Sequence, residues 1–160
     1  MIRHADKIED LATRETIASM SGLEFIQSIQ RGELPAPPIS KTLDYWMEEA
    51  LEGKVTFRGK PFFGAMNPIG TIHGGWFGTL LDSCMACAVQ TMLPAGQGYT
   101  TLEYKVNVIR PLFPSSGEVL AIGEASHVGR RTGIAEGRIV GAEDGKLYAT
   151  GSTTCMVFSL

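Results

Sequence analysis

The sequence is poor in cysteine, has no concentrated basic segment and lacks a long uninterrupted apolar run. Its net charge is -3, and without a basic face a nucleic-acid partner is not expected. The three cysteines are an odd number, and Asp6, Glu9 and Asp10 occupy the stretch where a secretory signal would be apolar. These absences predict a reduced, cytoplasmic protein.

The most apolar segment runs from Trp76 to Leu93 and is interrupted by Asp82 and Gln90. These interruptions predict a buried helix rather than a membrane span. Apolar residues make up 44% and charged residues 19% of the 160 residues, which is a globular composition. The length is sufficient for one domain with a substantial core. We therefore expect a single globular fold and no membrane partner.

Residues 1–38 have a helical pattern. Apolar residues in Ile8–Ala12 recur at a spacing of three to four, which predicts a helix with one apolar face. Ser21, followed three residues later by Glu24, has the form of a capping box. It predicts a second short helix that continues through Ile29.

A proline-rich segment, Pro35–Pro38, follows these two predicted helices. Such a composition favours a stiff, extended linker. We therefore divide the chain into a helical arm, residues 1–38, and a compact domain, residues 39–160.

Residues 40–60 allow two interpretations. Met47–Leu51 favours a helix by propensity alone. Glu52-Gly53 followed by the β-branched and aromatic run Val55–Phe57 instead indicates a turn and a strand. We predict a β-hairpin here.

A long helix from Trp76 to about Met92 is predicted next, because the segment has almost no polar face and Pro94 ends it. Only strand signals follow, with Asp144-Gly145 as a hairpin turn. The predicted strands are Thr100–Arg110, Glu118–Val128, Ile134–Gly141 and Lys146–Phe158. One buried helix and an antiparallel sheet give an α+β protein, whose free sheet edge predicts self-association.

Asp82 is the only formally charged residue between Phe62 and Leu102, and it lies in the middle of the most apolar helix. Burying an unpaired carboxylate is costly. In one interpretation Asp82 is a core residue whose carboxylate is stabilised by hydrogen bonds or by a solvent channel. In the other it serves as a general base or nucleophile in a largely dry cleft. We favour the second interpretation.

The start of the same helix carries His73-Gly74-Gly75. The first N–H groups of a helix have no internal partner and carry the positive end of the helix dipole. An oxygen that acquires negative charge would be stabilised there, and glycine lets a ligand approach the backbone closely. Gly74 lies about 12 Å from Asp82 along the axis at 1.5 Å per residue. Two antiparallel helices across a dimer could bring the two groups together, which predicts a shared site.

The segment Asn67–Gly75, followed by Leu80–Ser83, closely resembles the signature of hotdog-fold thioesterases of the phenylacetyl-CoA (PaaI-like) branch. The strand Thr100–Val106 with Ile109–Pro111, and the turn Val128–Arg131, resemble the same family. The resemblance covers about residues 43–158 and leaves the arm outside. It implies a hotdog fold, in which a curved antiparallel sheet wraps a long central helix, and hydrolysis of an acyl-CoA by a homodimer or homotetramer.

The resemblance also implies roles for individual residues. The Gly74 N–H would polarise the thioester carbonyl, and Asp82 would activate water or attack directly. Asn67 would position the water or the thioester, and His73 would support the loop. Thr101 would assist the water. The implied substrate-binding residues are Gly75, Thr100 as a rival to Thr101, Arg110, Gly129, Arg130 and Arg131, with the arginines facing the phosphates of coenzyme A.

No metal or redox cofactor is expected, and coenzyme A enters only as part of the substrate. Cys84 and Cys87 form a C-x-x-C that we interpret as core packing, because it lies mid-helix in apolar surroundings. Two alternatives to hydrolysis stay open. One is a hotdog enoyl-CoA hydratase or dehydratase, which a lone His73 makes less attractive. The other is an acyl-CoA sensor that binds without catalysis. The acyl group itself is not predicted.

Overall fold

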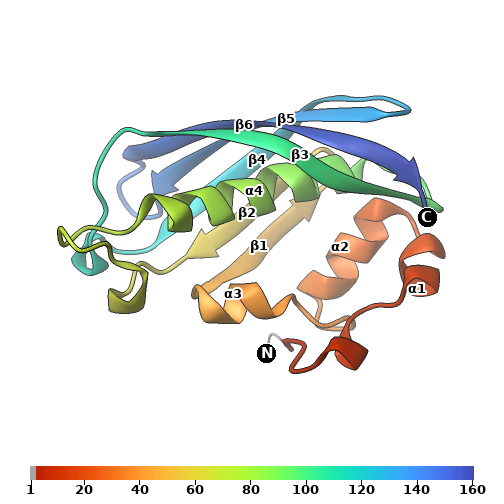
Figure 1. Cartoon of the computed structure of the whole chain (residues 1–160), viewed down its shortest axis with the longest axis horizontal. Coiled ribbons are helices and arrows are strands. Elements are labelled where there is room, and N and C mark those ends of the chain that lie inside the picture. Colours follow the sequence, from red (N-terminus) through yellow and green to blue (C-terminus); the bar gives the residue numbers. More distant parts are fainter. Residues whose placement is uncertain (1–2) are drawn as a thin grey trace.

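The computed structural model describes residues 3–160 as one six-stranded antiparallel sheet curved around a long helix (Figure 1). The strand order is β1-β2-β4-β5-β6-β3, so β1 and β3 form the two edges. The strands are β1 (Tyr45–Leu51), β2 (Lys54–Gly59), β3 (Gln97–Val108), β4 (Val119–Val128), β5 (Thr132–Gly141) and β6 (Leu147–Ser159). The helices are α1 (Arg14–Ala18), α2 (Gly22–Gln30), α3 (Pro38–Thr42) and α4 (Gly74–Thr91), with short 3-10 turns η1 (Ile8–Asp10), η2 (Phe63–Ala65) and η3 (Pro114–Ser116).

The predicted hotdog architecture is confirmed, as is the hairpin in residues 40–60. β1 and β2 pair from Tyr45 opposite Gly59 to Leu51 opposite Lys54, with a β-bulge between Met47 and Glu49. Tertiary pairing therefore overrides the helical propensity of Met47–Leu51, which lies on β1. The four strands after α4 also form as predicted, with boundaries shifted by at most three residues.

Helix α4 lies on the concave face of the sheet and carries much of the core. Its sheet-facing side chains are fully buried, among them Leu80, Leu81, Met85 and Val89. A close backbone approach fixes its height above the sheet, since a Cβ built on Gly123 of β4 would lie 2.3 Å from the carbonyl carbon of Cys84. Only glycine fits there, so the position of α4, and with it Asp82, is tightly constrained.

The first predicted helix is wrong. Ile8–Asp10 forms a single 3-10 turn with Ile8 82% exposed, and the helix α1 begins only at Arg14. Thr13 caps α1 through its hydroxyl, which accepts from the N–H of Thr16 at 3.2 Å. The segment of spaced apolar residues is too short to nucleate a helix, and the capping residue Thr13 instead determines where the helix begins. The second helix is confirmed as α2, with Ser21 accepting from Glu24 N–H.

The proline-rich segment is packed rather than free. Ala36 is buried and pairs with the start of the arm, because its N–H donates to Arg3 O at 2.7 Å and Ala5 N–H donates to Ala36 O at 3.0 Å. Pro38 then begins α3, so this helix spans the predicted boundary at residue 38. The division of the chain into two parts stays a prediction.

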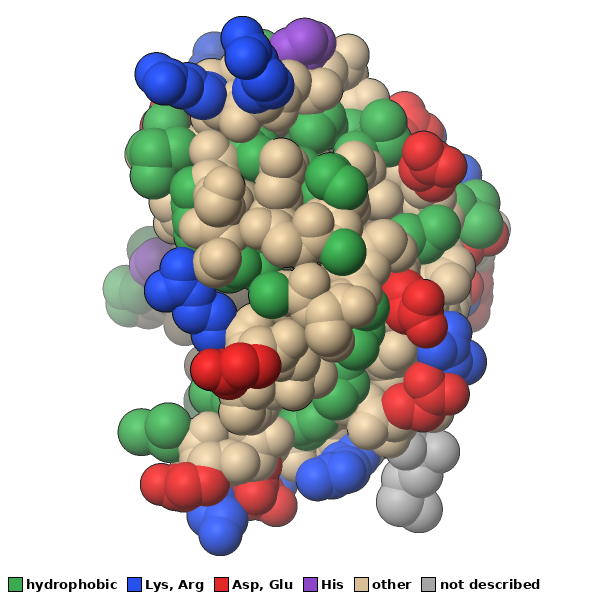
Figure 2. All heavy atoms as spheres, turned by 90° about the vertical axis from the view of Figure 1, so that its right-hand side faces the viewer, with side chains coloured by type: hydrophobic (Ala, Val, Ile, Leu, Met, Phe, Trp, Pro, Cys, Tyr) green, Lys and Arg blue, Asp and Glu red, His purple; other side chains and the backbone are tan. Residues whose placement is uncertain are grey.

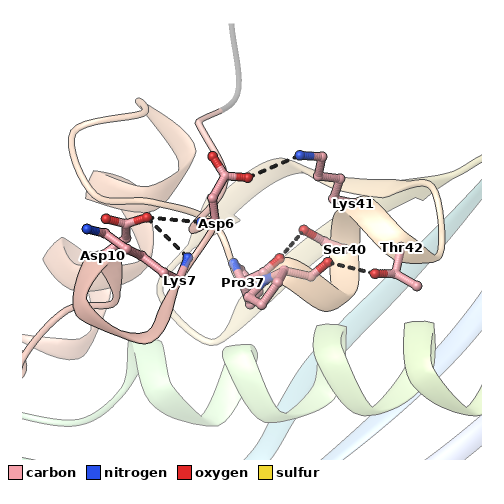
Figure 3. A network of polar contacts seen from close by, with 8 residues as sticks. Asp6, Lys7, Asp10, Pro37, Ser40, Lys41 and Thr42 are labelled. Carbon is pink, nitrogen blue, oxygen red and sulfur yellow. Dashed lines mark hydrogen bonds and ion pairs between the residues drawn. The ribbon is translucent and has the colours of Figure 1, made fainter.

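Side-chain contacts hold the start of the arm against α3 (Figure 3). Lys41 forms an exposed ion pair with Asp6 at 3.2 Å. Ser40 donates to Pro37 O at 2.8 Å inside the first turn of α3. The exposed ion pair contributes at most about 1 kcal/mol, so the backbone pairing at Ala36 is the firmer attachment.

The arm crosses one side of the curved sheet from β1 to the start of β3, and in Figure 1 it occupies the lower right. Gln27 and Gln30 of α2 donate to backbone carbonyls of β1, Ala50 O at 3.0 Å and Glu48 O at 2.8 Å. Gly22 packs directly on α4, since a Cβ there would lie 1.7 Å from Gln90 O. In residues 3–160, no helix is both long and apolar enough to cross a membrane.

Candidate active site

Asp82 lies half-buried on the face of α4 that turns away from the fully buried side chains. The hydroxyl of Thr101 on β3 donates a hydrogen bond to Asp82 Oδ1 at 3.0 Å. A β-bulge between Thr101 and Glu103 shifts the register of β3 against β6 at this point. Thr100 is exposed, so Thr101 is the threonine in contact with the carboxylate.

Burial raises the pKa of Asp82 above its ordinary value, and the Thr101 hydrogen bond partly opposes this shift. The first effect arises because the carboxylate loses hydration, and the second because the hydroxyl stabilises the charged form. A carboxylate with a raised pKa is a stronger base than a solvated one. Asp82 is therefore suited to accept a proton from water.

Asp82 also borders an apolar cavity of about 420 Å³ between α4 and the arm. This volume lies within the usual range of small-ligand pockets, about 300–1,000 Å³. Helix α4 contributes Ser83, Ala86, Cys87 and Gln90 beside Asp82. The arm and the flanking strands supply the remaining walls, which are Leu11, Ala12, Ile17, Phe25, Ile26, Ile29, Gln30, Pro35, Ala36, Pro37, Ile39, Ser40, Tyr45, Trp46, Met47, Phe57 and Tyr99.

The N-terminus of α4 forms a separate cluster with one donor left open. His73 is the capping residue, and its Nδ1 accepts from Gly75 N–H at 2.9 Å. The Gly75 N–H is therefore occupied. Gly74 is exposed, and a Cβ on it would meet no atom within 4 Å. Its N–H, which a first helical turn leaves without an intrahelical partner, is the accessible one.

The side chain of Asn67 folds back on its own loop. Its Oδ1 accepts from Ile69 N–H at 3.1 Å and Thr71 N–H at 3.2 Å, and its Nδ2 donates to Thr71 Oγ1 at 2.7 Å. The loop then reaches α4 through His73, whose N–H donates to Ala65 O at 2.8 Å. Since an amide nitrogen carries two hydrogens, Asn67 Nδ2 has one beyond the Thr71 bond.

Within one chain, the predicted catalytic residues fall into two groups. Asp82 and Thr101 meet at the middle of α4, whereas Asn67, His73 and Gly74 gather at its N-terminus. Eight residues separate Gly74 from Asp82 on the helix, about 12 Å at 1.5 Å per residue. A single protomer does not bring both groups to one reacting carbon.

The predicted phosphate-binding arginines are also divided. Arg110 N–H bonds to Tyr148 O, whereas Arg131 O accepts from Val157 N–H, nine residues further along β6. At about 3.3 Å per residue these points are about 30 Å apart. Arg130 and Arg131 lie with Gly129 in the β4–β5 turn, where basic side chains gather at the top of the face in Figure 2. Arg110 therefore lies at the same end of the sheet as Gly74. Arg131 lies at the opposite end, which is the end nearer to Asp82.

Several site residues carry no sequence signal of their own. Tyr45 and Tyr99 come from opposite edge strands, and the Tyr45 hydroxyl lies 3.0 Å from Ser83 Oγ. Ser83 follows Asp82 directly, which is the only local hint.

Burial raises the pKa of Cys87 to about 12, so its thiol stays protonated and is a poor nucleophile.

The family model of the thioesterase superfamily matches residues 69–148, half of the chain, which include the Gly74 corner, Asp82 and Thr101. The chain belongs to this superfamily. A comparison with curated proteins finds no significant match. The chain is similar to a putative thioesterase, a phenylacetic acid degradation-related protein from Ralstonia eutropha, at 28% identity over 82% of this chain and 98% of that one, with a TM-score of 0.74.

Two PaaI proteins are similar as well. The phenylacetic acid degradation protein PaaI from Thermus thermophilus, in a variant form, is 26% identical over 74% of this chain and 97% of its own, with a TM-score of 0.67. The E. coli PaaI protein, from the phenylacetic acid degradation operon, shares the fold at 18% identity, with a TM-score of 0.73 over 86% and 94% of the two chains. The chain thus belongs to the thioesterase superfamily and shares its hotdog fold with the PaaI proteins.

We expect Asp82→Asn to raise the unfolding midpoint at neutral pH. The folded-state pKa lies above the unfolded one, so the carboxyl favours folding while protonated and this contribution is lost as pH rises through the folded pKa. Asparagine stays neutral and can still accept from Thr101. Thermal unfolding of parent and variant should diverge more at neutral pH than near the ordinary aspartate pKa, about 3.9. A lower midpoint for the variant at neutral pH would instead identify Asp82 as a structural residue.

Proposed function

We propose that this protein hydrolyses an acyl-CoA with an apolar acyl group, aromatic or of medium chain length, to the free acid and coenzyme A. The observation that carries this proposal is the carboxylate of Asp82, fixed by Thr101 at the edge of an apolar cavity. Family membership supports thioester hydrolysis in general. The residues and the substrate belong to the proposal.

In the proposed reaction, Asp82 either takes a proton from water as the water oxygen adds to the thioester carbonyl carbon, or attacks that carbon directly. The carbonyl oxygen gains negative charge beside the Gly74 N–H and the positive end of the α4 dipole. Collapse of the tetrahedral species breaks the C–S bond, and in the water route the proton held by Asp82 passes to the leaving thiolate. In the direct route the thiolate leaves first. Water then cleaves the acyl anhydride formed on Asp82, which releases the acid, restores the carboxylate and supplies the proton that the thiolate takes up.

The two groups of catalytic residues would meet across a homodimer. β3 is a sheet edge twelve residues long, and it exposes the apolar side chains of Leu102, Tyr104 and Val108 by 59%, 46% and 50%. A long apolar edge favours pairing with another chain. Antiparallel pairing of two copies along β3 would lay the Gly74 end of one against the Asp82 end of the other.

The same arrangement would unite the divided arginines. Arg110 shares the Gly74 end of the sheet, and Arg130 and Arg131 share the Asp82 end. Antiparallel pairing would therefore bring Arg110 of one protomer toward the Arg130–Arg131 turn of its partner. Guanidinium groups suit phosphate oxygens, so this region could hold the phosphates of coenzyme A, with Gly129 shaping the turn.

Asn67 would complete the site from the Gly74 side. Its remaining Nδ2 hydrogen can bind the attacking water or the thioester, while its other contacts hold the loop. Gly75 would contribute through the close approach that glycine permits, since its N–H serves the His73 cap. The proposed steps use only groups of the two protomers, without a metal or redox cofactor, and a cytoplasmic location stays part of the proposal.

Turnover should depend on Asp82 and its pH dependence on Thr101. Asp82→Asn should lower kcat by roughly 100-fold or more, the usual contribution of a general base. Thr101→Val removes the bond that lowers the Asp82 pKa, so the acidic limb of the pH–rate profile should move to higher pH. Thiol release from a panel of acyl-CoAs checks both, with Thr100→Val as the matched control on the exposed neighbour.

The same panel separates the alternatives. An acyl-CoA that binds tightly without thiol release would identify a sensor. Water addition to an enoyl-CoA without thiol release would identify a hydratase. Parent-level hydrolysis by Asp82→Asn would contradict the proposed mechanism.

The shared site can be tested by mixing inactive variants. Gly74→Pro deletes the proposed donor, yet proline suits a first helical position, and His73 before it already has the extended conformation that precedes proline. It should reduce kcat by roughly 100- to 1,000-fold, while Gly74→Ala, which keeps the N–H, should lose much less.

Co-assembled Gly74→Pro and Asp82→Asn chains should regain about a quarter of the parent activity, because half of the dimers would carry one intact site. Size-exclusion chromatography of the mixture checks that mixed dimers form. Mixed dimers without regained activity would place both groups of each site in one protomer.

A further inference from the structure

The segment of residues 11–40, which is most of the arm together with the first turn of α3, supplies more than half of the residues around the cavity next to Asp82, although it precedes the part of the chain that matches the superfamily. Its contributions are almost all apolar, from Leu11 through Ile39. The two polar residues of this segment in the wall already have partners, since Gln30 donates to Glu48 O and Ser40 donates to Pro37 O. The wall that the arm provides therefore offers little to a polar ligand and favours hydrocarbon.

The cavity follows α4 from Asp82 to Gln90, both of which line it. Eight residues separate them, about 12 Å at 1.5 Å per residue. Gln90 is only 4% exposed, and Gly22 of the arm rests on its backbone, so the arm closes this end. An extended alkyl chain built from bonds of about 1.5 Å advances roughly 1.3 Å per carbon, so this length holds about eight to ten carbons.

We propose that residues 11–40, most of the arm and the first turn of α3, form the wall and the closed end of the acyl pocket and select unbranched acyl groups of about eight to ten carbons. The inference rests on the proposed function for its thioester, and it assigns the specificity to a segment outside the part that matches the superfamily. Phe25 and Ile29 of α2 are the side chains that limit the space for the acyl chain, because they line the cavity from the helix that packs on α4.

Ile29→Trp should fill part of the pocket. The ratio of kcat/KM for decanoyl-CoA to that for butyryl-CoA should fall about tenfold or more, since one methylene in an apolar pocket is worth about 10- to 200-fold. Phe25→Ala should shift the preference toward longer chains. Glu24→Trp is the matched control, because it adds the same side chain to the exposed face of the same helix and should leave the ratio unchanged.

A second variant tests the closure itself. Gly22→Ala places a methyl group where Gln90 O already lies, so α2 must move away from α4. Discrimination between octanoyl-, decanoyl- and hexadecanoyl-CoA should weaken, with the sheet still folded by circular dichroism. Hydrolysis with the same chain-length profile in Ile29→Trp, Gly22→Ala and Glu24→Trp would overturn the role of the arm and leave the proposed function standing.

Binding separates the two proposals if turnover fails. Decanoyl-CoA titrated calorimetrically into the Asp82→Asn protein, with and without Ile29→Trp, reports the pocket independently of chemistry. If the parent does not hydrolyse decanoyl-CoA but the Ile29→Trp background binds it more weakly, the proposed function is contradicted and the assignment of the acyl pocket is retained. Equal binding in both backgrounds, or a parent preference for phenylacetyl-CoA over every straight chain, would overturn the assignment of the acyl group.

Discussion

The carboxylate of Asp82 inside an apolar helix is the constraint on which the rest of the site depends. An unpaired buried charge is unfavourable, so the surroundings must hold it in place and hydrate or bind it. Among residues 3–160, the one hydrogen-bond partner of this carboxylate is the Thr101 hydroxyl, which lies on the edge strand rather than in the core. The group thus remains half-open toward the cavity instead of being neutralised by a cation. This combination is the reason that Asp82 is the candidate for the reactive carboxylate in the proposed function.

Much of the fold could be predicted because its signals are local. The apolar run of α4 with Pro94 after it, the turn at Asp144-Gly145, and the strand composition after the helix each determine a neighbouring element. The hairpin at β1 and β2 required a choice against helical propensity, and turn chemistry at Glu52-Gly53 was the better guide. The failure at Ile8–Ala12 has the opposite cause, since a few apolar residues without a cap do not start a helix.

The candidate site was only partly predictable, because much of it depends on contacts between distant segments. Asp82 was visible as a lone charge in an apolar run. The choice of Thr101 over Thr100 depends on which face of β3 is turned toward α4, and the arm-lined cavity depends on Gly22 docking against Gln90. Neither has a periodic signature. Gly74 and Gly75 can be told apart only from the structure, because the Gly75 N–H donates to the His73 ring whereas the Gly74 N–H stays accessible.

The amide groups of Gln27 and Gln30 have a consequence for how copies of this chain can meet. By binding carbonyls of β1, they occupy hydrogen-bonding positions along one margin of the sheet. A sheet with two open margins can add neighbours at both ends and grow without limit. When one edge of the sheet is obstructed, edge-to-edge pairing can join each copy to only one partner, in a closed two-fold pair. The segment that walls the cavity would then also protect the protein against fibrous assembly.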